Sequence, residues 1–462
     1  MGSIRTIHYD VVVIGGGSAG FAAAASSAKN GAKTLLIESS PMIGGDLTSG
    51  LPIDGCVNQR GEWIVGGVFN ELLEQCSKVN GYIGKFYDWR ALWIVAVDPD
   101  LISYAIIKLL KKYNVSLLLY SVCNDVLVED SQIRGVFVNS KGSQTLVTGD
   151  VFIDCTGDGD IAAAAGAPYE IGEETGELQP VSIVFKMKNI NSESFLTFIK
   201  NHPENFGLGE NPYIGKTKSE CALELFKQGI PKAFFVHDGP IMKKAIESGE
   251  LYKSSMIALG PISMDYKEIS VNSTRIAGIN AIDVMSLSGK LYELVEQVDM
   301  CVNFLKKRVP GFENAEFSGL APKIGVRETR RIMGDYVLTV DDVLSAKKTA
   351  EAIAKGAHEM DLHGSGTAHE RKSIKDAGSF DIPFGCLIPQ NVENLLIAGR
   401  CISSTRHANS AARLMGTCMA TGQAAGTAAA ICVHDMTKVR KLPVEKIRKI
   451  LKEQGAILEG TY

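Results

Sequence analysis

Paired cysteine motifs are absent from this 462-residue sequence. Its ten cysteines are scattered singly, and no C-x-x-C spacing occurs. This pattern excludes a redox disulfide pair, and it predicts neither an iron–sulfur cluster nor a zinc cluster. Most of the cysteines have apolar neighbours, which is typical of buried, reduced thiols in a cytoplasmic protein.

An excess of charge of one sign and long apolar runs are also lacking. The 48 basic and 52 acidic residues give a net charge of −4 without a run of like charge, which argues against a nucleic-acid partner. No run reaches the ~18–20 apolar residues that a membrane span needs, and the N-terminus lacks the features of a signal peptide. We therefore expect a soluble, cytoplasmic protein of two or three structural units.

The stretch from Tyr9 to Glu38 carries the most information. Residues 11–14 are four consecutive β-branched residues, as in a strand that is buried on both faces of a parallel sheet. Gly15, Gly17 and Gly20 then occupy the glycine positions of G-x-G-x-x-G. A helix beginning near Ser18 and Ala19 would point its free N–H groups and positive end at a pyrophosphate. The pattern predicts a dinucleotide site.

A second apolar strand, residues 34–37, ends in Glu38, which lies 18 residues after Gly20. An acid at this place accepts hydrogen bonds from a ribose, whereas an arginine would have indicated a 2′-phosphate. Glu38 therefore favours FAD or NAD.

The segment after Glu38 contains two adjacent glycines followed by hydroxyl residues, a pattern that suits backbone passing close to a cofactor. It resembles the second FAD motif of the glutathione-reductase-like flavoproteins, in which the Gly-Gly segment runs beside the ribityl chain. This resemblance implies that the cofactor is FAD. The residues that we expect near it are Ser39, Gly45, Asp46, Thr48 and Ser49.

Residues 115–138 read as short strands and predict a β-meander inserted between two halves of the nucleotide fold. The chain then returns to a buried strand, residues 151–154, followed by a glycine-rich turn. In the same flavoproteins an (A/C)-T-G motif follows such an insertion, and Cys155-Thr156-Gly157 resembles it. The resemblance implies that Thr156, Gly157 and Asp158 contact the cofactor.

Residues 171–379 are more polar and contain no second G-x-G-x-x-G. We expect a substrate domain with a mixed sheet, and direct use of a nicotinamide is disfavoured. Within it, residues 325–336 resemble the G-(V/I)-R-E-(S/T)-R-R signature of bacterial FAD-dependent oxidoreductases. Arg327 and Arg331 either bind an anionic group or form structural ion pairs with Glu328.

His358, His363 and His369 fall within a dozen residues. Their spacings of five and six do not place them on one helical face, and no acidic partner pattern accompanies them. We therefore expect no metal site.

The last segment of the nucleotide fold is a strand, residues 394–398, that runs into Gly399 and Arg400. A helix of small residues beginning at Gly416 and Thr417 follows. By resemblance, this strand and helix close the FAD site, and the N-terminus of the helix faces the N1–C2=O edge of the flavin, where it would stabilise the reduced anion.

Four residues are candidates for catalysis. His407 lies between the closing strand and the flavin-facing helix and titrates near neutral pH, which suits a general acid or base; the alternative is a structural or ribityl hydrogen bond. Arg406 and Arg413 flank His407 and, with Arg327, would hold a carboxylate or an enolate-like oxygen.

These patterns predict an α/β protein with a discontinuous Rossmann-like FAD-binding domain, residues 1–170 and 380–462, and an α+β substrate domain, residues 171–379. The function we expect is an FAD-dependent oxidoreductase that moves a hydride between a small oxygenated organic substrate and flavin N5, with an unknown electron donor or acceptor. Two alternatives remain, a flavoprotein that modifies tRNA and a non-catalytic FAD-binding scaffold. A homo-oligomer is possible.

Overall fold

A seven-stranded sheet dominates the structure, a computed structural model that describes residues 5–172 and 176–460. The strand order is β5-β2-β1-β8-β7-β6, with β20 also paired to β8. The strands are β1 (Arg5–Ile14), β2 (Thr34–Ile37), β5 (Ser116–Leu118), β6 (Ser121–Glu129), β7 (Gln132–Ser140), β8 (Ser143–Asp154) and β20 (Leu395–Ile397).

The centre of this sheet is parallel, since β1 pairs in parallel with β2 and β8, β2 with β5, and β8 with β20. Side chains of β1 alternate between two cores: Val11 and Val13 belong to one, and Val12 and Ile14 to the other. The sheet is thus buried on both faces, as the uninterrupted apolar run predicts.

The expected meander is confirmed, because β6, β7 and β8 pair antiparallel in chain order. Helix α3 (Pro99–Lys112) begins directly after Asp98. The Asp98 carboxylate accepts hydrogen bonds from the backbone N–H groups of Asp100 and Leu101, so it caps the first turn.

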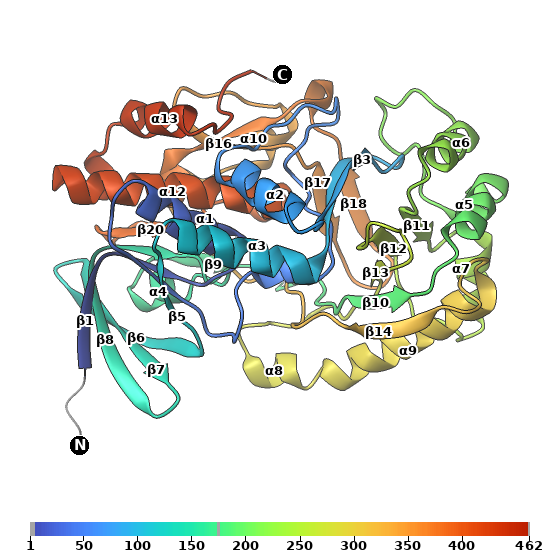
Figure 1. Cartoon of the computed structure of the whole chain (residues 1–462), viewed down its shortest axis with the longest axis horizontal. Helices are drawn as coiled ribbons and strands as arrows, with labels where there is room; N and C mark the ends of the chain where they lie inside the picture. The colour runs from blue at the N-terminus through green and yellow to red at the C-terminus, as the bar shows by residue number, and fades with distance from the viewer. Residues whose placement is uncertain (1–4, 173–175, 461–462) are drawn as a thin grey trace.

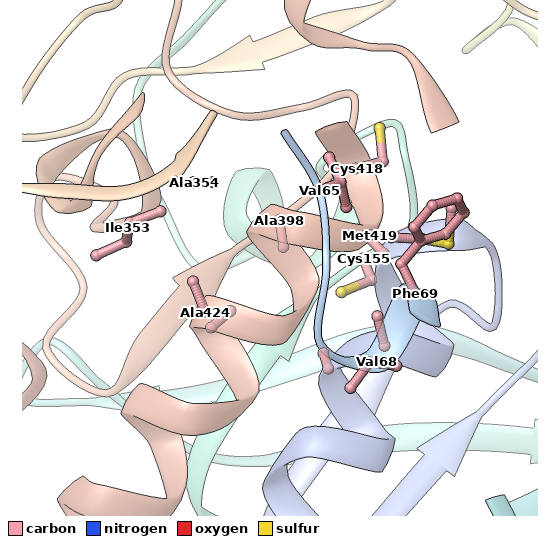
Figure 2. Packing of buried hydrophobic residues seen from close by; sticks show 14 of the residues in the cluster. Val65, Val68, Phe69, Cys155, Ile353, Ala354, Ala398, Cys418, Met419 and Ala424 are labelled. Atoms are coloured by element: carbon pink, nitrogen blue, oxygen red, sulfur yellow. The ribbon is translucent and has the colours of Figure 1, made fainter. Parts of the chain in front are cut away.

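Two helices cross closely over one face of the sheet, α1 (Ser18–Lys29) and α12 (Met415–Asp435). Gly422 and Gly426 allow this approach, since a Cβ added at either would lie 2.1 Å from the carbonyl oxygen of Ala19 or Ala23. The same apolar core joins α12 to α2 (Val68–Ser77). Phe69 of α2 lies beside Met419 of α12 (Figure 2).

We expect Gly422→Ala to destabilise the protein strongly, because its methyl group has no space against the α1 backbone. Overpacking of this kind costs about 1–3 kcal/mol, and backbone cannot move aside as a flexible side chain can. The measurement is the thermal midpoint of the FAD-free protein. The control is Gly17→Ala, whose added Cβ meets no atom within 4 Å; equal midpoints for the two variants would contradict the packing argument.

The second large sheet has the strand order β11-β12-β13-β10-β14. Each of its described pairs is antiparallel, so the mixed sheet expected for residues 171–379 is wrong in this detail. The short connection between β12 and β13 forces antiparallel pairing, because a parallel pair needs a long crossover. The strands are β10 (Phe185–Lys188), β11 (Ala233–Val236), β12 (Met256–Pro261), β13 (Ile269–Asn272) and β14 (Glu316–Leu320).

Helices surround both sheets, and two of them follow one another closely, α8 (Val284–Ser288) and α9 (Leu291–Arg308). The others are α4 (Asp160–Ala164), α5 (Ser192–Asn201), α6 (Lys218–Gln228), α7 (Pro240–Glu247), α10 (Val340–Leu344), α11 (Arg406–Ala412) and α13 (Val444–Glu453).

Within residues 5–172 and 176–460 there are also four two-stranded sheets, and the hairpin β17–β18 lies between the regions of the two large sheets (Figure 1). The pairs are β3 (Tyr82–Tyr87) with β4 (Trp93–Val97), β9 (Tyr169–Ile171) with β15 (Arg330–Ile332), β16 (Ala352–Gly356) with β19 (Phe380–Pro383), and β17 (Met360–His363) with β18 (His369–Lys372).

Candidate active site

A groove of about 430 Å³, here called the nucleotide groove, runs along the carboxyl ends of β1, β2, β8 and β20. Stretches that are far apart in the chain supply its walls, which is the placement expected of a ligand site in an open parallel sheet. Of the residues predicted to bind a cofactor, Gly15, Gly17, Ser18, Ala19, Glu38, Ser39, Gly45, Asp46, Thr156, Gly157, Asp158, Gly399 and Arg400 line it.

The glycines of the first turn differ in what surrounds them. A Cβ on Gly15 would lie 2.4 Å from the carbonyl oxygen of Cys155, and one on Gly20 would lie 1.6 Å from the carbonyl oxygen of Gly15. Gly17 has open space instead, and it is the residue from which α1 begins. The space beside Gly17 is therefore where a pyrophosphate fits against the helix N-terminus.

Glu38 stands at the end of β2 and borders the same groove. Its Oε2 accepts a hydrogen bond of 2.5 Å from the N–H of Gly16, and its Oε1 accepts one of 2.7 Å from the N–H of Ser40. These contacts hold the carboxylate beside the glycine turn, where a ribose hydroxyl would reach it.

Five predicted cofactor residues do not line the groove: Gly20, Thr48, Ser49, Gly416 and Thr417. The hydroxyls of Thr48 and Ser49 donate to the backbone carbonyls of Gly45 and Asp46 within their own turn. Gly416 instead donates its N–H to the carbonyl of Asp54 at 3.0 Å. Of the five, Ser49 lines the smaller cavity beside this groove.

Asp158 and Arg400 form an ion pair of 2.7 Å at the middle of the groove. Thr329 joins them, because its hydroxyl donates to Asp158 at 2.6 Å and accepts from Arg400 at 2.8 Å. Burial, the largest single influence, favours the neutral acid, but Arg400, the hydrogen bond from Thr329 and the charge of Lys323 together lower the pKa of Asp158. The motif at 325–331 is thus tied to the groove through Thr329.

A second space, here called the inner cavity, has a volume of about 180 Å³ and adjoins the groove. Both spaces share the lining residues Asp46, Lys323, Val326, Arg413 and Met415. Cavities of this type, beside a cofactor groove and with a few convergent polar groups, are typical substrate sites.

Comparison with known families agrees with this geometry. The model of a family described as FAD dependent oxidoreductase matches residues 10–451. The chain belongs to this family. FAD is therefore its cofactor, and the open space at Gly17 and the carboxylate of Glu38 suit that ligand.

Solved structures that resemble this FAD-dependent oxidoreductase show its fold alone, because their sequence identities are low. A geranylgeranyl bacteriochlorophyll reductase-like protein from Thermoplasma acidophilum is 14% identical, with a TM-score of 0.50 over 98% of this chain and 85% of that chain. The flavin-dependent brominase Bmp2 is 13% identical, with a TM-score of 0.50 over 96% and 83% of the two chains.

No curated protein matches the oxidoreductase by sequence. The glutathione-reductase-like subclass implied by its Gly-Gly segment stays a prediction. Among the described residues, no helix combines the length and apolar character needed to cross a membrane.

The four arginines considered for anion binding fall into two pairs, Arg331 with Arg406 and Arg327 with Arg413. Glu328 is buried and accepts hydrogen bonds from Arg406 at 2.9 and 3.0 Å and from Arg331 at 3.2 Å. Arg331 and Arg406 therefore serve as structural ion pairs. Arg327 and Arg413 instead line the inner cavity.

Arg327 and Arg413 have no carboxylate within 4 Å in the part of the chain that the structure describes. Arg327 donates to the carbonyl of Pro180 at 2.7 Å and to the hydroxyl of Ser182 at 3.0 Å. Burial, together with repulsion by Arg413 and Arg275, lowers the pKa of Arg327 to about 9. Two positive charges that repel each other beside a cavity create a site for an anion.

Asp54 was not singled out in the sequence, yet it lines the inner cavity. Its Oδ1 is buried and has no hydrogen-bond partner among the described residues. Burial raises the pKa of Asp54 to about 7, although the nearby Lys232 opposes the shift. The sequence did contain a sign of this residue's role, because Asp54 is an acid that follows the apolar residues 51–53 shortly after the Gly-Gly segment.

His407 lies on α11, half-buried, and it lines neither the nucleotide groove nor the inner cavity. The hydrogen bond from Lys372 lowers the pKa of Glu370, with a smaller contribution from His407, and the side chain of Glu370 points to the opposite face of β18 from His369. A catalytic role for His407 stays a prediction, and the inner cavity offers other titratable groups.

Three side chains of the hairpin β17–β18 meet: Asp361, His363 and His369. Asp361 and His363 also line the inner cavity. Helical spacing does not apply to these histidines, because the segment is a hairpin in which period-two alternation and cross-strand pairing decide which residues share a face.

Proposed function

We propose that this FAD-dependent oxidoreductase transfers a hydride between flavin N5 and a small oxygenated organic substrate that carries a carboxylate or a similar anionic group. The observation that carries the proposal is the pair of guanidinium groups, Arg327 and Arg413, which line a cavity adjoining the nucleotide groove and lack a carboxylate partner among the described residues. An anionic substrate would neutralise both.

The size of the cavity supports a small substrate. Its volume of about 180 Å³ is below the range of about 300–1,000 Å³ that is typical of sites for drug-sized ligands. Bound FAD supplies the hydride acceptor or donor. The arginines would orient the substrate by its anionic end, so that its oxygenated carbon faces the groove.

Asp54 suits the accompanying proton transfer. With a pKa near 7, it can accept a proton from a substrate hydroxyl in one direction and return it in the other. Gln179 contacts the neighbouring arginine, since its Oε1 lies 3.5 Å from the Nη2 of Arg413.

The test is anaerobic reduction of the FAD-loaded protein by a panel of small hydroxy acids, with neutral alcohols of the same size and NADH as comparisons. We expect an acid to bleach the flavin, and we expect Arg327→Gln to raise the concentration needed for half-maximal rate by about 10- to 100-fold, because a charge-assisted bond contributes about 1.5–3 kcal/mol. The bound FAD should be unchanged.

The matched control is Arg134→Gln, since Arg134 is exposed on the meander strand β7 and distant in the fold from the cavity. It should behave as wild type. Equal bleaching by neutral alcohols in wild type and in Arg327→Gln would remove the basis for an anionic substrate. Bleaching by NADH alone would indicate a reductase whose acceptor is a different molecule.

A further inference from the structure

The cluster of Asp361, His363 and His369 follows from the register of the β17–β18 hairpin. His363 and His369 are direct cross-strand partners, and Asp361 precedes His363 by two residues. Side chains two apart on a strand share a face, as do directly opposed residues, so all three project to the same side. Their ligand atoms lie within 4.8 Å of one another.

The contacts inside this cluster converge on the carboxylate. Asp361 Oδ2 lies 3.1 Å from His363 Nε2, and Oδ1 contacts His369 Nε2. The two imidazole rings stack with their centroids 4.5 Å apart. Both histidines therefore turn the same ring nitrogen toward one point beside the inner cavity.

We propose that Asp361, His363 and His369 bind a divalent transition-metal ion such as Zn²⁺ or Mn²⁺. Two imidazoles and one carboxylate are a donor set that these ions accept, and three protein ligands leave at least one position open. Asp361 and His363 line the inner cavity, so the open position faces the space assigned to the substrate.

The charge around the cluster permits a cation. The nearest guanidinium, that of Arg371, has its Nε 3.8 Å from Asp361 Oδ1. Arg371 also pairs with Glu359 and with Glu210, a carboxylate that it shares with Arg90. Arg275, Arg327 and Arg413 also act electrostatically on Asp361. An anionic substrate bound by Arg327 and Arg413 would offset part of this positive charge.

The hairpin holds the three ligands in place. Arg275 Nη2 donates to the carbonyls of Gly364 and Ala368 at 2.6 and 2.7 Å, which fastens the turn between the strands. The N–H of Asp361 donates to the hydroxyl of Ser410 at 3.1 Å and ties β17 to α11. Ligands on a braced element keep their spacing without the ion, which favours binding.

The role of the ion, as distinct from its binding, rests on the proposed function. In the open position it would accept the hydroxyl or carbonyl oxygen of the substrate and orient that oxygen beside the groove. A bound cation would also favour the ionised form of a substrate hydroxyl. Binding of the metal alone does not depend on a substrate.

The experiment uses tag-free, FAD-loaded protein that has been stripped with a chelator and then titrated calorimetrically with Zn²⁺ and, separately, with Mn²⁺. We expect one equivalent of at least one ion per chain, confirmed by elemental analysis after dialysis. His369→Ala and Asp361→Asn should each weaken binding by about 100-fold or more, because loss even of a group that only supports a ligand costs about 10- to 100-fold.

The control is His8→Ala. His8, Asp10 and Asp150 form an exposed group whose ligand atoms also lie within 4.8 Å of one another, and its loss should leave the measured site intact. FAD content and the metal-free thermal midpoint show whether each variant is folded. The added metal should raise the midpoint of wild type and not that of His369→Ala.

Three outcomes would overturn the proposal: no saturable binding of either ion to wild type, equal binding by wild type and both hairpin variants, or loss of binding in His8→Ala alone. Because no substrate is present, these outcomes are independent of the proposed function. A flavin that no carboxylate reduces would refute that function and leave the metal site standing.

Discussion

Gly17→Ala should yield a folded protein that binds FAD about 10- to 100-fold more weakly, since forcing a methyl group into an occupied contact costs about 1–3 kcal/mol. The added Cβ meets no protein atom within 4 Å, so the fold has room for it. That same space faces the nucleotide groove at the start of α1, where the pyrophosphate would lie. The measurement is the ratio of FAD to protein after gel filtration, followed by titration of the apoprotein with FAD.

Substitutions at two further glycines distinguish a loss of FAD binding from a loss of folding. Gly20→Ala places a Cβ 1.6 Å from the carbonyl oxygen of Gly15, so stability and FAD should be lost together. Gly260→Ala brings its Cβ no closer than 3.6 Å to Lys232 and lies outside the nucleotide groove, so it should retain FAD. Retention of FAD by Gly17→Ala at wild-type affinity would place the phosphate elsewhere.

Asp54→Asn should slow reduction of the flavin by substrate by about 10²- to 10⁴-fold, the usual contribution of a positioned acid or base. With a pKa near 7, Asp54 is the base in substrate oxidation only when it is ionised. The rate of oxidation should therefore rise as the pH increases through about 7, and the asparagine variant should lose this rise. Stopped-flow reduction from pH 5 to 9 measures both effects.

Ionisation of Asp54 should favour substrate oxidation but lower the stability of the folded protein. Because burial raises the pKa of Asp54 from 3.8 to about 7, the folded state holds a proton that the unfolded state releases. The stability linked to this proton is fully present below about pH 4 and is lost as the pH rises through 7. Asp54→Asn, which stays neutral, should therefore be more stable than wild type at pH 8, by up to about 4 kcal/mol.

A substitution elsewhere controls both measurements. Asp125 is exposed on the meander strand β6, and Asp125→Asn should change neither the rate nor the thermal midpoint at pH 8. An asparagine variant of Asp54 that is slow but keeps the pH dependence of wild type would show that another group transfers the proton. In that case His358, whose pKa burial lowers to about 4, is the next candidate in the inner cavity.

The arginines show why part of the site needed the tertiary structure. Arg327 and Arg331 stand in the same short motif, and the sequence supports anion binding and ion pairing equally for both. Folding brings Arg406, 78 residues from Glu328, onto that carboxylate beside Arg331 and leaves Arg327 at the cavity. The partners of a buried charge are set by which distant segments pack together, and no local pattern records this.

The sequence alone determined the buried strand β1, the glycine turn, the acid at Glu38 and the FAD-dependent family, because these depend on residues only a few positions apart. Steric freedom at glycine, strand alternation and helix capping all act over that short range. Only the tertiary structure decided the antiparallel second sheet, the displacement of His407 from the inner cavity, the exposure of Asp54 to that cavity, and the meeting of Asp361 with two histidines. Burial, charge balance and cross-strand register depend on contacts between segments far apart in the chain, so they exist only once it has folded.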